Sequence, residues 1–205
     1  MFDARLRRVI DPPLNRIGRS LAGLGLNANT TTLTGFAFGL LAIAAIALGQ
    51  FGLGLGLLLL NRLADGIDGA VARHAGITDL GGYLDIVCDF IVYAGIVFAF
   101  ALVDPEDNAL AAAFLVFSFM GTGSSFLAFA TIAAKRGLTT QARGHKTLYY
   151  LGGLTEGFET ATFLVLCCLF PGQFTWMAWV FGAMCWVTTI SRIAQAFDAF
   201  DEPHG

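Results

Sequence analysis

The chain has few charged residues for its length. Only 13% of its 205 residues are Asp, Glu, Lys or Arg, whereas ordinary soluble domains carry roughly a quarter. Hydrophobic residues make up 56% of the chain, and its mean hydropathy is +0.70. These values exclude an intrinsically disordered chain. The net charge of −3 offers no basic surface for nucleic acid, so we expect no nucleic-acid partner.

Cysteine is also sparse, and its placement excludes a small disulfide scaffold. The four cysteines, Cys88, Cys167, Cys168 and Cys185, all lie inside apolar stretches. No histidine is spaced with them as in a zinc site. We interpret them as apolar packing residues.

What the sequence has in abundance is apolar stretches, and six of them predict an all-α polytopic membrane protein with six transmembrane helices. Each is long enough to cross a bilayer as a helix, and the alternating polarity of a strand barrel is absent. We expect one domain over 1–205, with the six-helix bundle at 33–196. The expected spans are 33–48, 51–72, 82–103, 109–134, 148–170 and 176–196.

The positions of the basic residues predict the orientation of the spans. The first 20 residues hold five arginines among apolar residues, which favours an N-terminal amphipathic interfacial helix within 1–30, the alternative being an unstructured basic tail. Further basic residues are Arg73 after the second span, four in the segment 135–146 and Arg192 at the C-terminal end, whereas the three opposite loops have none. We therefore expect an integral protein of a bacterial inner membrane, with both termini and the active site cytoplasmic.

Four aspartates lie inside the second and third apolar stretches, where a charged residue costs about 2.5–3.5 kcal/mol near the bilayer centre. Asp65 and Asp68 are three residues apart, and Asp85 and Asp89 are four apart, so each pair shares one helix face. A short link makes the two helices antiparallel neighbours whose acidic faces can meet. Two or more hard divalent cations, Mg²⁺, Mn²⁺ or Ca²⁺, would offset the repulsion.

The neighbours of these aspartates suggest phosphoryl chemistry on a lipid. Gly69, Ala72 and Gly82 are small and leave room for a ligand. Arg73 stands where it can meet a phosphate. The acids could instead form structural salt bridges between the helices with Arg62 and Arg73, but two basic residues cannot neutralise four acids. A cation-binding membrane transporter or channel remains the alternative.

The aspartates belong to a longer pattern that resembles the signature of the CDP-alcohol phosphotransferase (CDP-alcohol phosphatidyltransferase) family. All eight fixed positions match over 25 residues. A weaker match precedes the first span, where Ala28 replaces the proline that the family often has. The signature residues are Asp65, Asp68, Gly69, Ala72, Arg73, Gly82, Asp85 and Asp89, and the weaker match is Asn29 and Thr32.

The resemblance implies a metal-dependent enzyme of phospholipid biosynthesis. Such an enzyme transfers a phosphatidyl or similar group from a CDP-linked lipid, here expected to be CDP-diacylglycerol, to an alcohol hydroxyl and releases CMP. Asp65, Asp68 and Asp85 would hold two divalent ions, Mg²⁺ or Mn²⁺. Asp89 would contact the second ion and act as general base. An inactive relative with a scaffolding role is a further alternative.

The resemblance also implies a donor site and an assembly. Gly69 and Ala72 would make space for the cytidine, and Arg73 would support the site. Asn29, Thr32 and Gly82 would complete the substrate-binding residues. The resemblance further implies a homodimer.

The identity of the acceptor stays open, because two groups of residues point in opposite directions. Lys135, Arg143 and Lys146 favour an acceptor that carries phosphate, such as glycerol phosphate or inositol phosphate, although such residues are also ordinary loop charges of a cytoplasmic side. Glu156 and Glu159 favour an amino-alcohol such as serine, ethanolamine or choline. The phosphate-bearing acceptors are slightly preferred.

Overall fold

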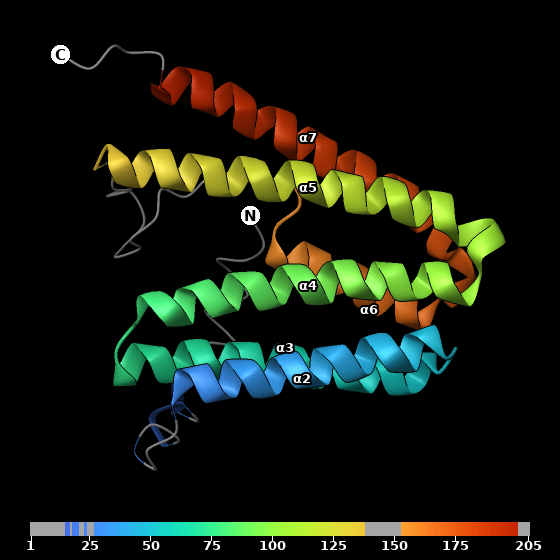
Figure 1. Ribbon diagram of the computed structural model, residues 1–205, viewed down its shortest axis with the longest axis horizontal. Helices are drawn as coiled ribbons and strands as arrows, with labels where there is room; N and C mark the ends of the chain where they lie inside the picture. The colour runs from blue at the N-terminus through green and yellow to red at the C-terminus, as the bar shows by residue number, and fades with distance from the viewer. Residues whose placement is uncertain (1–14, 17, 21–22, 24–26, 138–152, 201–205) are drawn as a thin grey trace.

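The computed structural model describes residues 15–16, 18–20, 23, 27–137 and 153–200. Within these residues the regular secondary structure is entirely helical (Figure 1), which confirms the predicted all-α polytopic membrane fold. Most of the predicted interfacial segment at 1–30 lies outside the described residues. The elements are α2 (Ala28–Ala47), α3 (Phe51–Ala75), α4 (Asp79–Val103), α5 (Pro105–Lys135), α6 (Gly157–Leu169), the short 3₁₀ helix η2 (Pro171–Gln173) and α7 (Phe174–Phe200).

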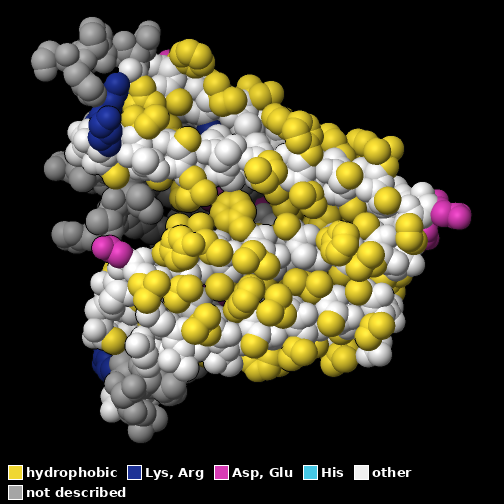
Figure 2. Space-filling model, in the orientation of Figure 1, with side chains coloured by type: hydrophobic (Ala, Val, Ile, Leu, Met, Phe, Trp, Pro, Cys, Tyr) yellow, Lys and Arg dark blue, Asp and Glu magenta, His cyan; other side chains and the backbone are white. Residues whose placement is uncertain are grey.

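Four of the described helical segments are long and apolar enough to cross a membrane by length and composition. These are Ala28–Ala47, Asp79–Val103, Pro105–Lys135 and Pro171–Phe200. The other two expected spans correspond to α3, which carries Arg62, Asp65 and Asp68, and to α6, which is a shorter apolar helix of 13 residues. Figure 2 shows apolar side chains spread along the visible face, with most of its charged side chains at the two ends.

The helices around the aspartates are longer than the apolar stretches predict. Helix α2 begins at Ala28, upstream of the expected residue 33, because the side chain of Asn27 caps it. Helices α3 and α4 are joined by only three residues, 76–78. Gly76 adopts φ 108°, which glycine tolerates, and the hydroxyl of Thr78 accepts a 3.1 Å hydrogen bond from the first turn of α4.

The fifth expected span, 148–170, begins outside the described residues and is wrong over 153–156. Helix α6 begins only at Gly157, and residues 153–156 are not helical. The hydroxyls of Thr155 and Thr188, from α7, lie 2.9 Å apart. This contact ties the non-helical stretch to a neighbouring helix, which hydropathy alone does not predict.

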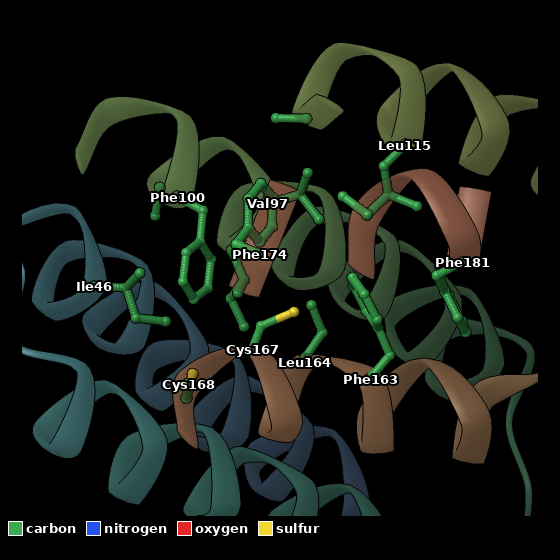
Figure 3. Packing of buried hydrophobic residues seen from close by; sticks show 14 of the residues in the cluster. Ile46, Val97, Phe100, Leu115, Phe163, Leu164, Cys167, Cys168, Phe174 and Phe181 are labelled. Carbon is green, nitrogen blue, oxygen red and sulfur yellow. The ribbon is translucent and has the colours of Figure 1, made fainter. Parts of the chain in front are cut away.

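The apolar core lies where the helices converge, at the end opposite the α3–α4 turn (Figures 1 and 3). The rings of Phe100 and Phe174 stack with centroids 4.5 Å apart, and those of Phe163 and Phe181 stack at 4.4 Å. The amide of Asn108 donates a 3.0 Å hydrogen bond to the carbonyl of Phe100. From this end α5 and α7 diverge from α2, α3 and α4.

Helix α2 organises the three-helix group that carries the aspartates. It packs along both α3 and α4, whereas the backbones of α3 and α4 remain largely apart. Close approach of α2 to α3 depends on Gly35, because a Cβ there would lie 2.8 Å from the Cβ of Ala64. The buried side chain of Asn61 also donates a 2.9 Å hydrogen bond to the carbonyl of Gly35. The separation of α3 from α4 leaves room for a site between them.

Candidate active site

Three of the four aspartates converge between α3 and α4. Asp65 and Asp68 come from α3 and Asp85 from α4, and each offers a carboxylate oxygen within 4.8 Å of the other two. Hard divalent cations take such oxygen ligands at about 2.0–2.6 Å, so small movements of these side chains would let one cation between them contact all three. The donor set therefore fits Mg²⁺ or Mn²⁺ and lacks the soft ligands that favour zinc.

Asp68 is held in place from the neighbouring helix. It is only 6% exposed, and its Oδ2 accepts a 2.6 Å hydrogen bond from the hydroxyl of Thr32. The side chain of Asn29 lies against the start of α4, since a Cβ on Gly81 would be 3.1 Å from its Oδ1. The two residues of the weaker sequence match thus face α3 and α4 from α2.

Asp89 stands outside the group of three and pairs with Arg62. The Nη2 of Arg62 lies 2.5 Å from Oδ1 of Asp89, and its Nη1 lies 3.3 Å from Oδ2. The hydroxyl of Tyr93 donates a further 3.2 Å hydrogen bond to Oδ2. The role of Asp89 as a ligand of a second metal remains a prediction, because in this structure both of its oxygens are engaged by protein donors.

Arg62 also reaches toward the three carboxylates. Its Nη1 is 3.7 Å from Oδ2 of Asp65 and donates a 2.6 Å hydrogen bond to the hydroxyl of Tyr93. Its Nε donates to Oδ1 of Asn61 at 2.9 Å. The four aspartates, Thr32 and Arg62 line one narrow pocket.

Sequence reasoning considered Arg62 as an ionic partner of the acids and set that interpretation aside, whereas the structure pairs Arg62 with Asp89. Sequence reasoning missed the participation of Tyr93. A spacing signal was present, because Arg62 precedes Asp65 by three residues and Tyr93 follows Asp89 by four. These spacings place both residues on the acidic faces of their helices. Nothing in the pattern, however, says which carboxylate the guanidinium would choose.

The predicted donor residues Gly69, Ala72, Arg73 and Gly82 lie on α3 and α4 near the aspartates in sequence but are not among the residues that line this pocket. A Cβ on Gly82 would meet nothing within 4 Å, and one on Gly69 would meet only Nη1 of Arg73 at 3.5 Å. Ala72 is half-buried. Arg73 is exposed and donates hydrogen bonds of 3.1 and 2.9 Å to Oδ1 of Asn15, a contact that the sequence did not predict.

The residues predicted to bind the acceptor do not form one group in the described part of the chain. Glu156 and Glu159 lie at the start of α6, where Oε1 of Glu156 accepts a 3.0 Å hydrogen bond from the backbone N–H of Gly153. Oε2 of Glu159 accepts one of 3.2 Å from the backbone N–H of Glu156. Lys135 is exposed in the last turn of α5. The remaining two candidates, Arg143 and Lys146, lie outside the described residues.

The fold and the site together define a polytopic helical membrane protein with an oxygen-rich pocket suited to hard divalent cations. The CDP-alcohol phosphatidyltransferase family model matches residues 26–191, and the chain belongs to this family.

The chain is also similar to individual proteins, one by sequence and one by structure. The inner membrane protein YnjF of Escherichia coli (strain K12) is 54% identical over 140 residues, which are 68% of each chain. The crystal structure of Mycobacterium tuberculosis phosphatidylinositol phosphate synthase with CDP-DAG bound has a TM-score of 0.72 at 20% sequence identity. That match covers 94% of this chain and 98% of the other, and at such low identity it supports the fold alone.

Proposed function

We propose that the protein transfers a phosphatidyl group from CDP-diacylglycerol to the hydroxyl of an alcohol and releases CMP. The observation that carries this proposal is the convergence of Asp65, Asp68 and Asp85 in a membrane protein of the CDP-alcohol phosphatidyltransferase family. The bound CDP-DAG of the mycobacterial structure supports a lipid donor. The reaction is a step of phospholipid biosynthesis.

The metal would be held by Asp65, Asp68 and Asp85, with Asp89 as a ligand of a second ion. Mg²⁺ or Mn²⁺ bound there would supply positive charge beside the donor's diphosphate, where negative charge builds up during phosphoryl transfer. Thr32 keeps Asp68 pointed into the site through its 2.6 Å hydrogen bond. The protein therefore needs a divalent cation for activity.

In the proposed reaction Asp89 takes the proton from the acceptor hydroxyl. The hydroxyl oxygen forms a bond to the phosphorus that carries the diacylglycerol, and the bond from this phosphorus to the bridging oxygen of the diphosphate breaks. CMP leaves with that electron pair. Asp89 suits this task because it lies in the same pocket as the three carboxylates but outside their group.

The donor's cytidine would lie beside Gly69, Ala72 and Gly82, outside the pocket that the aspartates line. The space around Gly82 supports this placement. Arg73, held by Asn15, would support the site beside the phosphates. Asn29 would contribute from the start of α2.

We favour an acceptor that carries phosphate, such as glycerol phosphate or inositol phosphate, bound with the help of Lys135, Arg143 and Lys146. This preference is supported by the contacts of the two glutamates on which the amino-alcohol alternative depends. Glu156 and Glu159 both accept hydrogen bonds from backbone N–H groups at the start of α6, and these contacts give them a structural task without an amino-alcohol.

We further propose that the protein is an integral protein of a bacterial inner membrane and works as a homodimer. The name of its Escherichia coli relative supports the location, and the distribution of basic residues supports cytoplasmic termini and a cytoplasmic site.

The proposal is tested by incubating the purified protein with CDP-diacylglycerol, Mg²⁺ or Mn²⁺, and a panel of alcohols. The panel contains glycerol phosphate, inositol phosphate, serine, ethanolamine and choline. We expect CMP release with at least one acceptor and a matching phospholipid by mass spectrometry, both lost in a chelator. A cation transporter would release no CMP with any of them, and that result would reject the proposal.

A further inference from the structure

The ion pair between Arg62 and Asp89 divides the four aspartates into two groups. We propose that Arg62 is a positioning residue that withholds Asp89 from the metal group. The protein without substrate then holds one divalent cation. A second cation binds only when the donor's diphosphate enters the site. The statement about the donor rests on the proposed function, whereas the statement about the free protein does not.

The geometry of the pair supports this role. The two terminal nitrogens of Arg62 face the two oxygens of Asp89, at 2.5 and 3.3 Å. Such a two-point contact fixes the plane of a carboxylate as well as its position. The hydroxyl of Tyr93 donates a third hydrogen bond to Asp89. A metal ion that recruited Asp89 would have to replace these donors.

The guanidinium is itself held in place. Oδ1 of Asn61 accepts a hydrogen bond from its Nε, and the ring of Tyr93 lies 4.9 Å from its central carbon. Asn61 is buried and anchored to α2 through the carbonyl of Gly35. Arg62 is therefore oriented toward Asp89 by its neighbours. An arginine is costly inside a membrane helix, which favours a specific task for it.

The balance of charge explains why one cation is preferred in the free protein. Asp65, Asp68 and Asp85 supply three negative charges, while Arg62 pairs most closely with the fourth aspartate and makes only a longer, 3.7 Å contact to Asp65. One dication leaves a single negative charge, but two dications would leave an excess positive charge beside a guanidinium. The donor's negatively charged diphosphate would remove that excess. Without Arg62, four carboxylates balance two dications by themselves.

The experiment counts Mn²⁺ ions on the purified protein by electron paramagnetic resonance, without donor. We expect about one tightly bound ion per chain for the wild type and about two for Arg62→Gln, since the freed Asp89 joins the site. The two ions of the variant should show spin coupling, because metal pairs of this kind lie about 4 Å apart. Adding CDP-diacylglycerol without an acceptor should bring the wild type to the coupled pair.

Two further variants separate this role from a general structural effect. Arg62→Lys keeps the charge and should restore the single-ion stoichiometry. Arg136→Gln removes an arginine at the C-terminal end of α5, which donates a hydrogen bond to the carbonyl of Phe200 in α7. This variant should bind Mn²⁺ as the wild type does. Each variant is first checked for an unchanged elution volume in gel filtration.

Tyr93→Phe tests the same ion pair without changing Arg62, so the inference remains testable if the Arg62 variants do not fold. It keeps Arg62 but removes the hydrogen bond from the Tyr93 hydroxyl to Asp89 and the one that this hydroxyl accepts from Arg62, so we expect the second Mn²⁺ to bind roughly threefold to tenfold more tightly. The inference is overturned if Arg62→Gln and Tyr93→Phe leave stoichiometry and affinity unchanged, or if the wild type without donor binds two ions tightly. The proposed function is rejected by a different result, namely that no acceptor yields CMP. In that case Arg62→Gln could still bind a second ion, and the inference about the free protein would stand.

Discussion

The hydroxyl of Thr32 in α2 donates a 2.6 Å hydrogen bond to the carboxylate of Asp68 in α3. Both residues are buried, and they are far apart in the sequence. Close packing of α2 on α3 at Gly35 brings the two together. The contact therefore couples helix packing directly to the position of one of the three carboxylates proposed to bind the metal.

Thr32→Val should weaken this coupling. The side chain has nearly the same volume but cannot donate a hydrogen bond, and one hydrogen bond to a charged group is worth about 1.5–3 kcal/mol. We expect Mn²⁺ affinity and CMP release to fall by roughly tenfold or more. Thr32→Ser keeps the hydroxyl and serves as the control. Wild-type affinity in Thr32→Val would show that Asp68 is positioned by other contacts.

Asp85→Asn should remove a ligand from the group of three carboxylates. We expect CMP release to fall by at least about 100-fold, because the metal supplies several kcal/mol of transition-state stabilisation. Asp79→Asn is a matched control, since Asp79 lies in the first turn of the same helix and is exposed. Equal losses in both variants would point to damage of α4 rather than of the metal site.

Asp89→Asn should abolish turnover while leaving metal-dependent binding of CDP-diacylglycerol partly intact. An amide cannot accept the proton of the acceptor hydroxyl, and general-base catalysis contributes about 10²–10⁴-fold. Turnover is measured as CMP release and donor binding by competition with labelled CDP-diacylglycerol. Full activity of this variant would refute the assignment of Asp89 as the base.

Gly35→Ala should lower the stability of the protein. The added Cβ would lie 2.8 Å from the Cβ of Ala64, so α2 and α3 must separate, at a cost of about 1–3 kcal/mol in the free energy of unfolding. Thermal unfolding in detergent measures the effect. Gly52→Ala adds the same methyl group in α3 where nothing lies within 4 Å, and it should not destabilise. A similar loss in both variants would mean that helix contact is not the cause.

The sequence by itself determined the helical membrane architecture, the acidic faces of α3 and α4, and membership of the CDP-alcohol phosphatidyltransferase family. Hydropathy and helical spacing are local properties, and the signature spans only 25 residues, so neighbours along the chain are enough to reveal them. The long apolar runs also predicted the interior of the helices well, although the helix ends differ from the expected ones, above all at the starts of α2 and α6.

Only the tertiary structure decided which polar groups meet. The partner of Asp89 is Arg62, the partner of Arg73 is Asn15, and the start of α6 is set by Thr188 of α7. Each of these contacts joins residues from different helices or from distant segments. Their pairing depends on how the helices pack and rotate against one another, and this is a property of the whole bundle that no local pattern contains.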